Sequence, residues 1–392
     1  MNDEIAENIK QLIRNVSRTD RCVLCGKCSA VCPAFKVMRE ELHSPRGRIA
    51  LIKAIMEGNL KPGKRTFEAL DGCISCGACE MACATGTSPR LAGLLVRSLP
   101  ELSGHYNNIA DIPDNAPLDN IDCILLEKLG IRNKDDKVFY PPNKPISPSK
   151  KNRMGKVTYL VDTIYRCRMP FLTGVTIELL TGAGREVLFP GKPIISIEPF
   201  LLLGRFNLAR RIAEQNLDIL SSITGKIICD SASLFFSLKT CLALFFNNDD
   251  AMKSGRELLA RLQLTSEFIR NRSFHKVLIE KNLRVTYLDS GSLKYGLKME
   301  EIPRKMINSI QGVTRVGIPE IDIIPGWSGI LTPKSKITQK VDAEIIDAVR
   351  RSDAEILILE DAPALYYLTR LFEKNHISLP VISFSQFMMN RY

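Results

Sequence analysis

The sequence has no long apolar run. Its most apolar stretches, PFLLLG (199–204) and CLALFF (241–246), are much shorter than the roughly 18 residues that a membrane-spanning helix needs. The opening residues MNDEIAENIK carry charges where a signal peptide needs an apolar segment. We therefore expect a cytoplasmic protein without a transmembrane segment, whose membrane contact, if any, is peripheral or made through a partner.

The residue sets of independent catalysis are also missing. No Ser/His/Asp set, P-loop or convincing G-x-G-x-x-G pattern occurs in the chain. Apolar residues make up 45% and charged residues 25%, which is ordinary for a globular protein and excludes a collagen-like, coiled-coil or wholly disordered chain. The sequence thus predicts a folded protein with no catalytic residues of its own.

Cysteine is present in an informative pattern, because eight of the twelve cysteines fall within residues 22–83. Residues 22–32 and 73–83 each read C-x2-C-x2-C-x3-C, a spacing typical of proteins that bind [4Fe–4S] clusters. Three thiolates at two-residue intervals can wrap one cluster, and the fourth cysteine leaves in another direction and reaches the other cluster. Gly26 and Gly77 would let the backbone approach the inorganic sulfides closely.

This pattern predicts two [4Fe–4S] clusters with exchanged fourth ligands. We assign Cys22, Cys25, Cys28 and Cys83 to cluster 1 and Cys73, Cys76, Cys79 and Cys32 to cluster 2. Zinc is the alternative, since four thiolates also make a tetrahedral zinc site. However, zinc sites usually combine two separated C-x2-C pairs, so the repeated fourfold run favours iron. Pro33 follows Cys32 as is usual, whereas Ala84 follows Cys83, which predicts a local difference in stiffness rather than a lost cluster.

The net charge of +11 and the pI near 9.1 leave three classes of partner open: nucleic acid, an acidic membrane surface and an acidic protein. General solubility explains the charge equally well. Two oxidised clusters, each carrying about −2 with its thiolates, would lower the total to about +7. Basic residues near the runs would partly offset the clusters: Lys27, Arg46, Arg48, Lys61, Lys64 and Arg65. No aromatic-plus-basic motif is present, so we do not expect nucleic acid as a partner.

The chain divides by pattern into a helical part, a connector and an α/β part. Residues 1–100 are expected to form a helical ferredoxin-like domain, with one helix over 3–16 and another that begins after Ser44 and ends near Gly58. Residues 101–155 are rich in Pro, Asn and Ser and predict an irregular connector with one short helix near 121–130. Beyond 156, short apolar runs alternate with helical segments, which indicates mainly parallel sheets.

The α/β part contains an internal repeat. KVTYLVD (156–162) matches RVTYLDS (284–290), and DSASLFF (230–236) matches DAPALYY (361–367). Both matches keep the same order at nearly the same offset, which favours duplication over chance. We therefore expect two α/β units, over residues 156–282 and 283–392, and an α/β fold class overall.

The two cysteine runs, joined by a segment that contains SPRGRI (44–49), resemble the iron–sulfur subunits of glycolate oxidase, lactate-utilisation and anaerobic glycerol-3-phosphate dehydrogenase systems, and also heterodisulfide reductase subunits. The resemblance implies a two-cluster ferredoxin domain followed by a duplicated cysteine-rich domain. It also implies redox partners, either a flavoprotein dehydrogenase or a heterodisulfide-reductase-type subunit.

The C-terminal part departs from this family at the Cys-Cys-Gly motifs and at further cysteines. The two motif positions fall at Ile195-Ser196-Ile197 and Ile324-Pro325-Gly326, and other expected cysteines fall at Leu234, Gly291 and Leu365. Since these side chains cannot ligate iron, we expect no third cluster there. Trp327 either fills that space or anchors a loop, and His43 is expected at the surface. The remaining cysteines are expected to be isolated buried side chains: Cys123, Cys167, Cys229 and Cys241.

Three functions follow from these patterns. The first is an electron-transfer subunit of an oxidoreductase complex, which relays electrons through two [4Fe–4S] clusters between a flavin-type dehydrogenase and a downstream acceptor. The second is thiol–disulfide chemistry of the heterodisulfide reductase type, with a partner supplying the catalytic site. The third is a nucleic-acid-binding iron–sulfur protein, whose affinity would fall steeply with salt. The first agrees best with the cysteine pattern.

Overall fold

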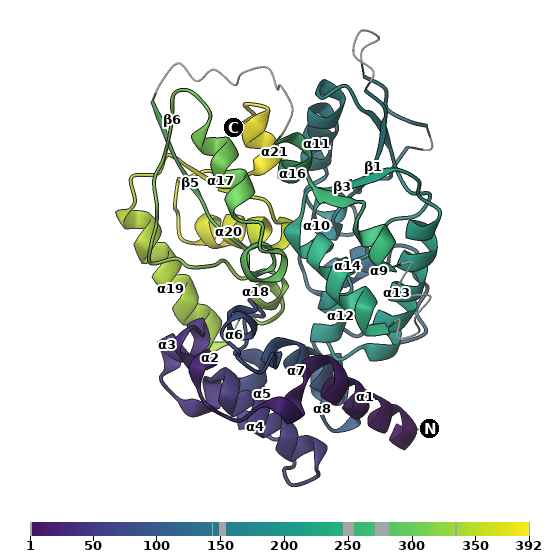
Figure 1. The fold of residues 1–392 in the computed structure, drawn as a ribbon, viewed down its shortest axis with the longest axis vertical. Coiled ribbons are helices and arrows are strands. Elements are labelled where there is room, and N and C mark those ends of the chain that lie inside the picture. The colour runs from purple at the N-terminus through teal and green to yellow at the C-terminus, as the bar shows by residue number, and fades with distance from the viewer. Residues whose placement is uncertain are drawn as a thin grey trace.

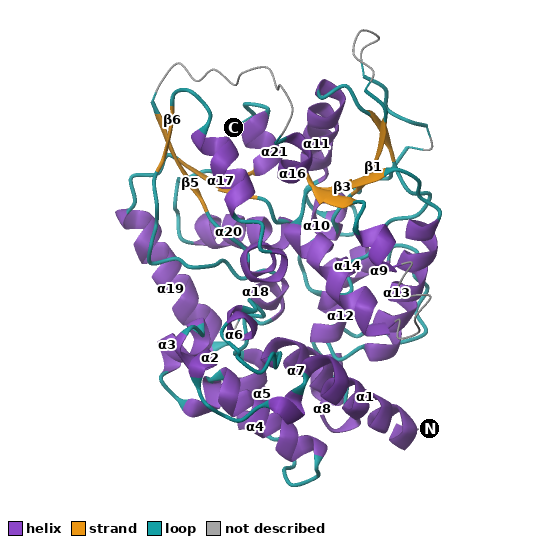
Figure 2. Ribbon diagram, viewed as in Figure 1, coloured by secondary structure: helices purple, strands orange, loops and turns teal. Residues whose placement is uncertain are grey.

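A computed structural model describes residues 2–142, 144–148, 154–245, 255–270, 282–333 and 335–391. Figure 1 shows the N-terminal helices at one end of the molecule and two α/β units side by side above them. Figure 2 shows the strands confined to these two units. The expected class, an α/β protein with a helical N-terminal part and mainly parallel sheets, is confirmed. No helix within the described ranges is long and apolar enough to cross a membrane.

The N-terminal part consists of short helices joined by the cysteine loops. Helix α1 covers almost the segment expected to be helical, and α4 begins as expected, with Pro45 in its first turn and the Ser44 hydroxyl accepting a hydrogen bond from the Gly47 amide at 2.8 Å. The elements are α1 (Asn2–Ser17), η1 (Thr19–Arg21), α2 (Lys27–Ala30), α3 (Pro33–Met38), η2 (Glu41–His43), α4 (Pro45–Met56), α5 (Lys64–Asp71), α6 (Ala78–Met81) and α7 (Pro89–Val96).

The segment after α7 is more ordered than the sequence predicts. Residues 101–107, expected to be irregular, belong to helix α8 (Pro100–Asn107), which buries Leu102 and Tyr106. The proline that opens the segment occupies the first position of this helix, so it begins the helix rather than breaking it. The short helix expected near 121–130 is α9 (Ile121–Lys128).

Each α/β unit contains one four-stranded parallel sheet, and the two sheets have equivalent strand orders, β2-β1-β3-β4 and β6-β5-β7-β8. This agreement confirms the expected duplication. Seven strands coincide with the apolar runs in the sequence; β4 was missed because its residues, Leu-Gln-Leu, continue the helix-like pattern of the segment before them and form no separate apolar run. The strands are β1 (Lys156–Leu160), β2 (Glu186–Leu188), β3 (Lys226–Cys229), β4 (Leu262–Leu264), β5 (Leu283–Tyr287), β6 (Val313–Arg315), β7 (Ile356–Leu359) and β8 (Val381–Ser383).

Helices surround both sheets. Those of the first unit are α10 (Thr163–Cys167), α11 (Pro170–Gly182), α12 (Glu198–Leu202), α13 (Phe206–Ser221), α14 (Ala232–Phe245) and α16 (Thr265–Ile269). Those of the second are the π-helix η3 (Ser292–Leu297), α17 (Glu301–Asn308), α18 (Trp327–Leu331), α19 (Lys336–Arg351), α20 (Ala362–Lys374) and α21 (Phe384–Met388). Because the strands of each sheet are parallel, their carboxyl ends all lie at one edge of that sheet.

A buried polar seam joins the two units where β3 and β7 end. Ser233 donates a hydrogen bond to Asp361 across the seam at 2.7 Å, and the Ser266 amide donates to Glu360 at 2.8 Å. Thr176 contacts Ser385 from the opposite unit at 3.0 Å. Because these polar groups are shielded from water, their mutual hydrogen bonds fix how the two units pack.

Burial in this seam raises the pKa of several carboxyl groups. Burial raises the pKa of Asp230 to about 6, that of Asp162 to about 7 and that of Glu360 to about 8. The unfolded chain returns each pKa to about 4. Between pH 4 and 8 the folded state therefore binds more protons than the unfolded state, so the free energy of unfolding falls as the pH rises through this window.

We expect Glu360→Gln to flatten this pH dependence, because a glutamine carbonyl still accepts from the Ser266 amide but does not titrate. The free energy of unfolding, measured with urea at several pH values, should decrease less between pH 5 and 8 in the variant than in the wild type. The difference in slope approaches about 1.4 kcal/mol per pH unit for one proton. The matched control is Glu344→Gln, which changes an exposed carboxylate. Parallel profiles for Glu360→Gln and the wild type would contradict the assignment.

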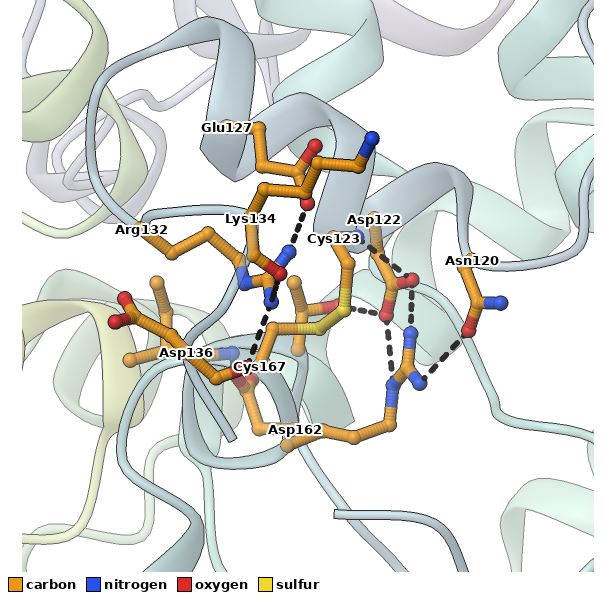
Figure 3. The surroundings of a disulfide bond; sticks show 12 residues. Asn120, Asp122, Cys123, Glu127, Arg132, Lys134, Asp136, Asp162 and Cys167 are labelled. Atoms are coloured by element: carbon orange, nitrogen blue, oxygen red, sulfur yellow. Dashed lines mark hydrogen bonds and ion pairs between the residues drawn. A yellow bond between two sulfur atoms is a disulfide. The ribbon is translucent and has the colours of Figure 1, made fainter. Parts of the chain in front are cut away.

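Helix α9 is fastened to α10 by a disulfide and an ion pair. Cys123 is bonded to Cys167, so these two are not the isolated thiols that the sequence suggested (Figure 3). The adjacent residues form a buried ion pair, with the Arg166 Nε donating to Asp122 at 3.1 Å. The two cysteines lie 44 residues apart and have no motif spacing, which is why no sequence pattern indicated the pairing.

Removing the disulfide should destabilise the folded chain under oxidising conditions. For a closed loop of 44 residues, loop-closure entropy gives about 4 kcal/mol for Cys123→Ser/Cys167→Ser. The measurement is urea unfolding with and without dithiothreitol. The wild type should be less stable with dithiothreitol than without it. The double variant should have the same unfolding midpoint with and without dithiothreitol. Equal midpoints for the wild type and the double variant without reductant would show that the bond does not constrain the unfolded chain.

Candidate iron–sulfur site

The two cysteine runs adopt the same backbone conformation. Gly26 and Gly77 precede α2 and α6 with φ of 82° and 85°, a left-handed conformation that favours glycine. Two residues earlier, Leu24 and Ser75 are also left-handed, with φ of 54° and 51°. Helices α2 and α6 pack against each other. The sequence repeat is therefore also a repeat of local structure.

Each of two pockets gathers four cysteines from both runs. The first cysteine pocket is lined by Cys22, Cys25 and Cys28 from the first run and by Cys83 from the second. The second cysteine pocket is lined by Cys73, Cys76 and Cys79 from the second run and by Cys32 from the first. The grouping in space is thus the exchanged grouping that the spacing suggested.

A second repeat, which the sequence reasoning missed, accompanies the runs. The tripeptide Ser-Pro-Arg occurs at 44–46 and again at 88–90. In both copies the serine caps a helix and the proline opens it. Pro45 and Pro89 each line both cysteine pockets. Comparing the segments that follow the two runs would have revealed this signal.

The arginines of this repeat face the two glycines. The Arg46 Nη1 lies 2.7 Å from the place that a Cβ on Gly26 would occupy, and the Arg90 Nε lies 3.8 Å from the corresponding place at Gly77. Each arginine is held by a glutamate: Arg46 by Glu41 at 2.7 Å and Arg90 by Glu80 at 3.1 Å. A side chain at Gly26 would therefore displace the guanidinium from the loop.

Hydrogen bonds to sulfur supply further positive potential. The Thr87 amide donates to the Cys83 Sγ at 3.2 Å, and the Thr85 hydroxyl lies 3.3 Å from the same sulfur. Burial acts to raise the pKa of Cys83, but these hydrogen bonds outweigh it and hold that pKa below its usual value. Here the chain turns after Cys83, whereas Pro33 after Cys32 starts helix α3. The replacement of proline by Ala84 thus accompanies a hydrogen-bonded turn.

The basic residues and His43 near the runs are either buried beside the cysteine loops or exposed to solvent. The Arg48 Nη1 lies 4.0 Å from the Cys32 Sγ, so Arg48 contacts the second cysteine pocket directly. His43, expected at the surface, is buried, and burial lowers its pKa. It is buried because η2 folds back on the start of α4. The other expected basic residues are exposed: Lys27, Lys61, Lys64 and Arg65.

The remaining cysteines offer no metal site within the described residues. Cys229 is a buried free thiol at the end of β3, and burial raises its pKa. The side chain of Cys241 lies outside the described residues. The Cys123 and Cys167 sulfurs are bonded to each other, and the neighbouring Asp122 is held by Arg166.

The positions that carry cysteines in the resembling family are filled by packing. Leu234, Leu365, Ile195 and Ile324 are all buried in the apolar core. A hollow between the second cysteine run and the start of α18 is lined by Ser75 and Cys76 from the run and by Ile324 and Gly326 from the second α/β unit. Buried Trp327 lines this hollow, in agreement with a space-filling role.

Comparison with known proteins agrees with this geometry. The family described as "4Fe-4S dicluster domain" matches residues 18–87. The probable glycolate oxidase iron–sulfur subunit of Bacillus subtilis is 22% identical, over 91% of this chain and 90% of its own length. The glycolate oxidase iron–sulfur subunit of Escherichia coli is 39% identical over 22% of either chain. A lactate utilization protein of an Exiguobacterium species is 25% identical, over 56% of this chain and 90% of its own length.

The chain is therefore similar to these iron–sulfur subunits along most of its length. The match at 18–87 falls on both cysteine runs and supports iron–sulfur clusters of the 4Fe–4S type at these cysteines. The donor set fits such a cofactor, because each pocket combines three thiols on a glycine-containing loop with a fourth thiol from the other run, beside an arginine.

The loop of the second cysteine pocket is packed tightly against the second α/β unit. A Cβ on Gly291 would lie 2.5 Å from the Cys76 Cα and 2.6 Å from its carbonyl oxygen. We therefore expect Gly291→Ala to push the loop and η3 apart, at a cost of about 1–3 kcal/mol. Thermal unfolding of the purified protein measures the effect.

The matched control for this prediction is Gly174→Ala. Gly174 lies within helix α11, and an added Cβ there would meet no atom within 4 Å. Alanine is the better helix former, so this variant should keep or slightly raise the melting temperature. A Gly291→Ala variant as stable as Gly174→Ala would contradict the close packing.

Proposed function

We propose that the protein is an electron-transfer subunit of an oxidoreductase complex, which relays electrons between a flavin-type dehydrogenase and a downstream acceptor through two [4Fe–4S] clusters. The observation that supports this most is the convergence of eight thiols into two separate sets of four. The names of the relatives point the same way, since two of them are iron–sulfur subunits of glycolate oxidase. That this chain works in such an oxidoreductase complex is part of the same proposal.

The proposed ligands are Cys22, Cys25, Cys28 and Cys83 for cluster 1 and Cys73, Cys76, Cys79 and Cys32 for cluster 2. When bound, such clusters accept and release single electrons. The chain supplies the surroundings: Arg46, Arg48 and Arg90 place positive charge beside the thiolates, and the Thr87 amide donates to a ligand sulfur. Such charges and hydrogen bonds favour the more negative reduced state and so raise the reduction potential.

Sulfur spacing supports iron over zinc. Four thiolates at about 2.3 Å from one zinc ion would lie about 3.8 Å from one another. Within the described part of the chain, no three of the eight thiols lie within 4.8 Å of each other. Wider spacing suits a cluster, in which each sulfur binds a different iron atom.

The alternative functions have less support. Thiol–disulfide chemistry needs reactive sulfur in the α/β units, but the one free thiol described there, Cys229, is fully buried. The hollow beside Trp327 is lined by a single thiol, that of Cys76, which is assigned to cluster 2, so its lining offers no ligand set for a third cluster. Because the described residues of the α/β units offer neither an accessible thiol nor the ligands for a further cluster, we assign these units a docking role. We propose a division into the two-cluster domain (1–100), a connector (101–155) and two α/β units (156–282 and 283–392).

Cysteine variants test the two-cluster proposal. Anaerobically purified protein should contain about eight iron and eight acid-labile sulfide per chain. Cys22→Ser and Cys83→Ser should remove the same electron paramagnetic resonance signal, and Cys73→Ser and Cys32→Ser the other, with about four iron atoms retained in each. This pattern arises only if the fourth ligands are exchanged between the runs.

Cys229→Ser is the control, because that thiol lies in neither cysteine pocket. It should keep both signals and all the iron. Two zinc ions without sulfide would overturn the proposal as a whole. Loss of the same signal in Cys83→Ser and Cys73→Ser would overturn the exchange of ligands alone.

A further inference from the structure

The internal symmetry of the cysteine loops allows the two cluster environments to be compared position by position. Val23 and Ile74 each follow the first cysteine of their run, and Leu24 and Ser75 follow them in the same left-handed conformation. A difference in exposure between such pairs therefore reflects what covers the loop, since the local backbone is the same.

The rest of the chain covers the second loop. Gly291, just before η3, lies against the Cys76 backbone, and the Tyr295 Cβ lies 3.4 Å from the place of a Cβ on Gly77. Ile74 is only 7% exposed. Helix α6, which follows this loop, packs against η3. The second cysteine pocket thus faces the α/β units.

The first loop lacks a comparable cover. Val23, the counterpart of Ile74, is 72% exposed, and Leu24 is 44% exposed. Cys25 is exposed as well, although it is the counterpart of half-buried Cys76. The flanking arginines differ in the same sense, since the Arg46 side chain is 37% exposed and that of Arg90 only 4%. Two large apolar side chains thus lie in water directly beside cluster-binding cysteines.

The charges around this bare loop are mostly positive. Arg18, Arg21 and Lys27 are exposed, and among the described residues none of them forms an ion pair. Among the acidic residues near this loop, Asp20 lies between Arg18 and Arg21 in the chain, and Glu41 is already held by Arg46. An apolar centre with a basic rim is complementary to a partner with an apolar centre and an acidic rim.

We propose that Val23, Leu24 and Cys25, rimmed by Arg18, Arg21 and Lys27, form the docking surface for an acidic one-electron carrier protein, here called the cluster 1 surface. This inference rests on the proposed function and adds to it which cluster meets the partner. In the transfer, reduced cluster 1 loses one electron to the flavin or iron–sulfur centre of the carrier. No bond is formed or broken.

The test measures electron transfer to an oxidised flavodoxin, an acidic flavoprotein, from protein reduced with stoichiometric dithionite. Stopped-flow rates are recorded at several salt concentrations and divided by the rate with neutral benzoquinone, which needs no docking surface. Val23→Ser/Leu24→Ser removes the apolar centre, and serine already occurs in the same left-handed conformation at Ser75. Arg21→Gln/Lys27→Gln removes charge from the rim.

The wild-type rate should fall steeply with salt, because attraction between opposite charges is screened. Val23→Ser/Leu24→Ser should lower the normalised rate about tenfold at every salt concentration. Arg21→Gln/Lys27→Gln should lower it at low salt only. Phe171→Ser and Lys305→Gln, which change exposed residues of α11 and α17, should keep both the rate and its salt dependence.

Two kinds of failure are distinguishable. Protein that holds both clusters and reduces benzoquinone, but whose loop variants transfer to flavodoxin at the wild-type rate, would overturn the cluster 1 surface and leave the relay intact. No reaction of the wild type with flavodoxin, or a rate that rises with salt, would overturn the acidic partner. Absence of iron or of reducible clusters would overturn the proposed function itself.

Discussion

The structure depends above all on the crossing of the two cysteine runs. Each cysteine pocket takes three thiols from one run and its fourth from the other, although the runs are separated by 40 residues. This crossing requires α2 and α6 to lie side by side and both loops to enter the left-handed region, which Gly26 and Gly77 allow. Helix α4, between the runs, and helix α7, after the second run, each begin with Ser-Pro-Arg and bring an arginine to one of the loops.

The chain contains two internal repeats, the pair of cysteine loops and the pair of α/β units. In each pair, the two copies differ in their surroundings. In the N-terminal part, one loop is packed under the second α/β unit and the other is bare. In the C-terminal part, two parallel sheets of equivalent order meet at a polar seam. Positions that carry cysteines in resembling proteins hold buried leucine and isoleucine here. The α/β units are folded, but these positions cannot ligate iron. Such units are suited to positioning a partner.

The connector also has a structural role. Helix α9 is fixed to α10 by the Cys123–Cys167 disulfide and by the Asp122–Arg166 ion pair next to it. A buried ion pair by itself contributes little net stability, because desolvation offsets the attraction between the charges. The covalent bond beside it shortens the loop that the unfolded chain can sample. Together they fasten the connector segment after α8 to the first α/β unit.

The sequence alone determined the cysteine pattern, the helical N-terminal part and seven of the eight strands, because these depend on local spacing and on runs of apolar residues. It could not reveal β4, whose Leu-Gln-Leu segment forms no apolar run separate from the helix-like pattern before it, or α8, whose opening proline also suits a loop. Tertiary structure decided the disulfide, the burial of His43 and the different covering of Val23 and Ile74. These features depend on which distant segments meet, and identical local spacing contains no information about that.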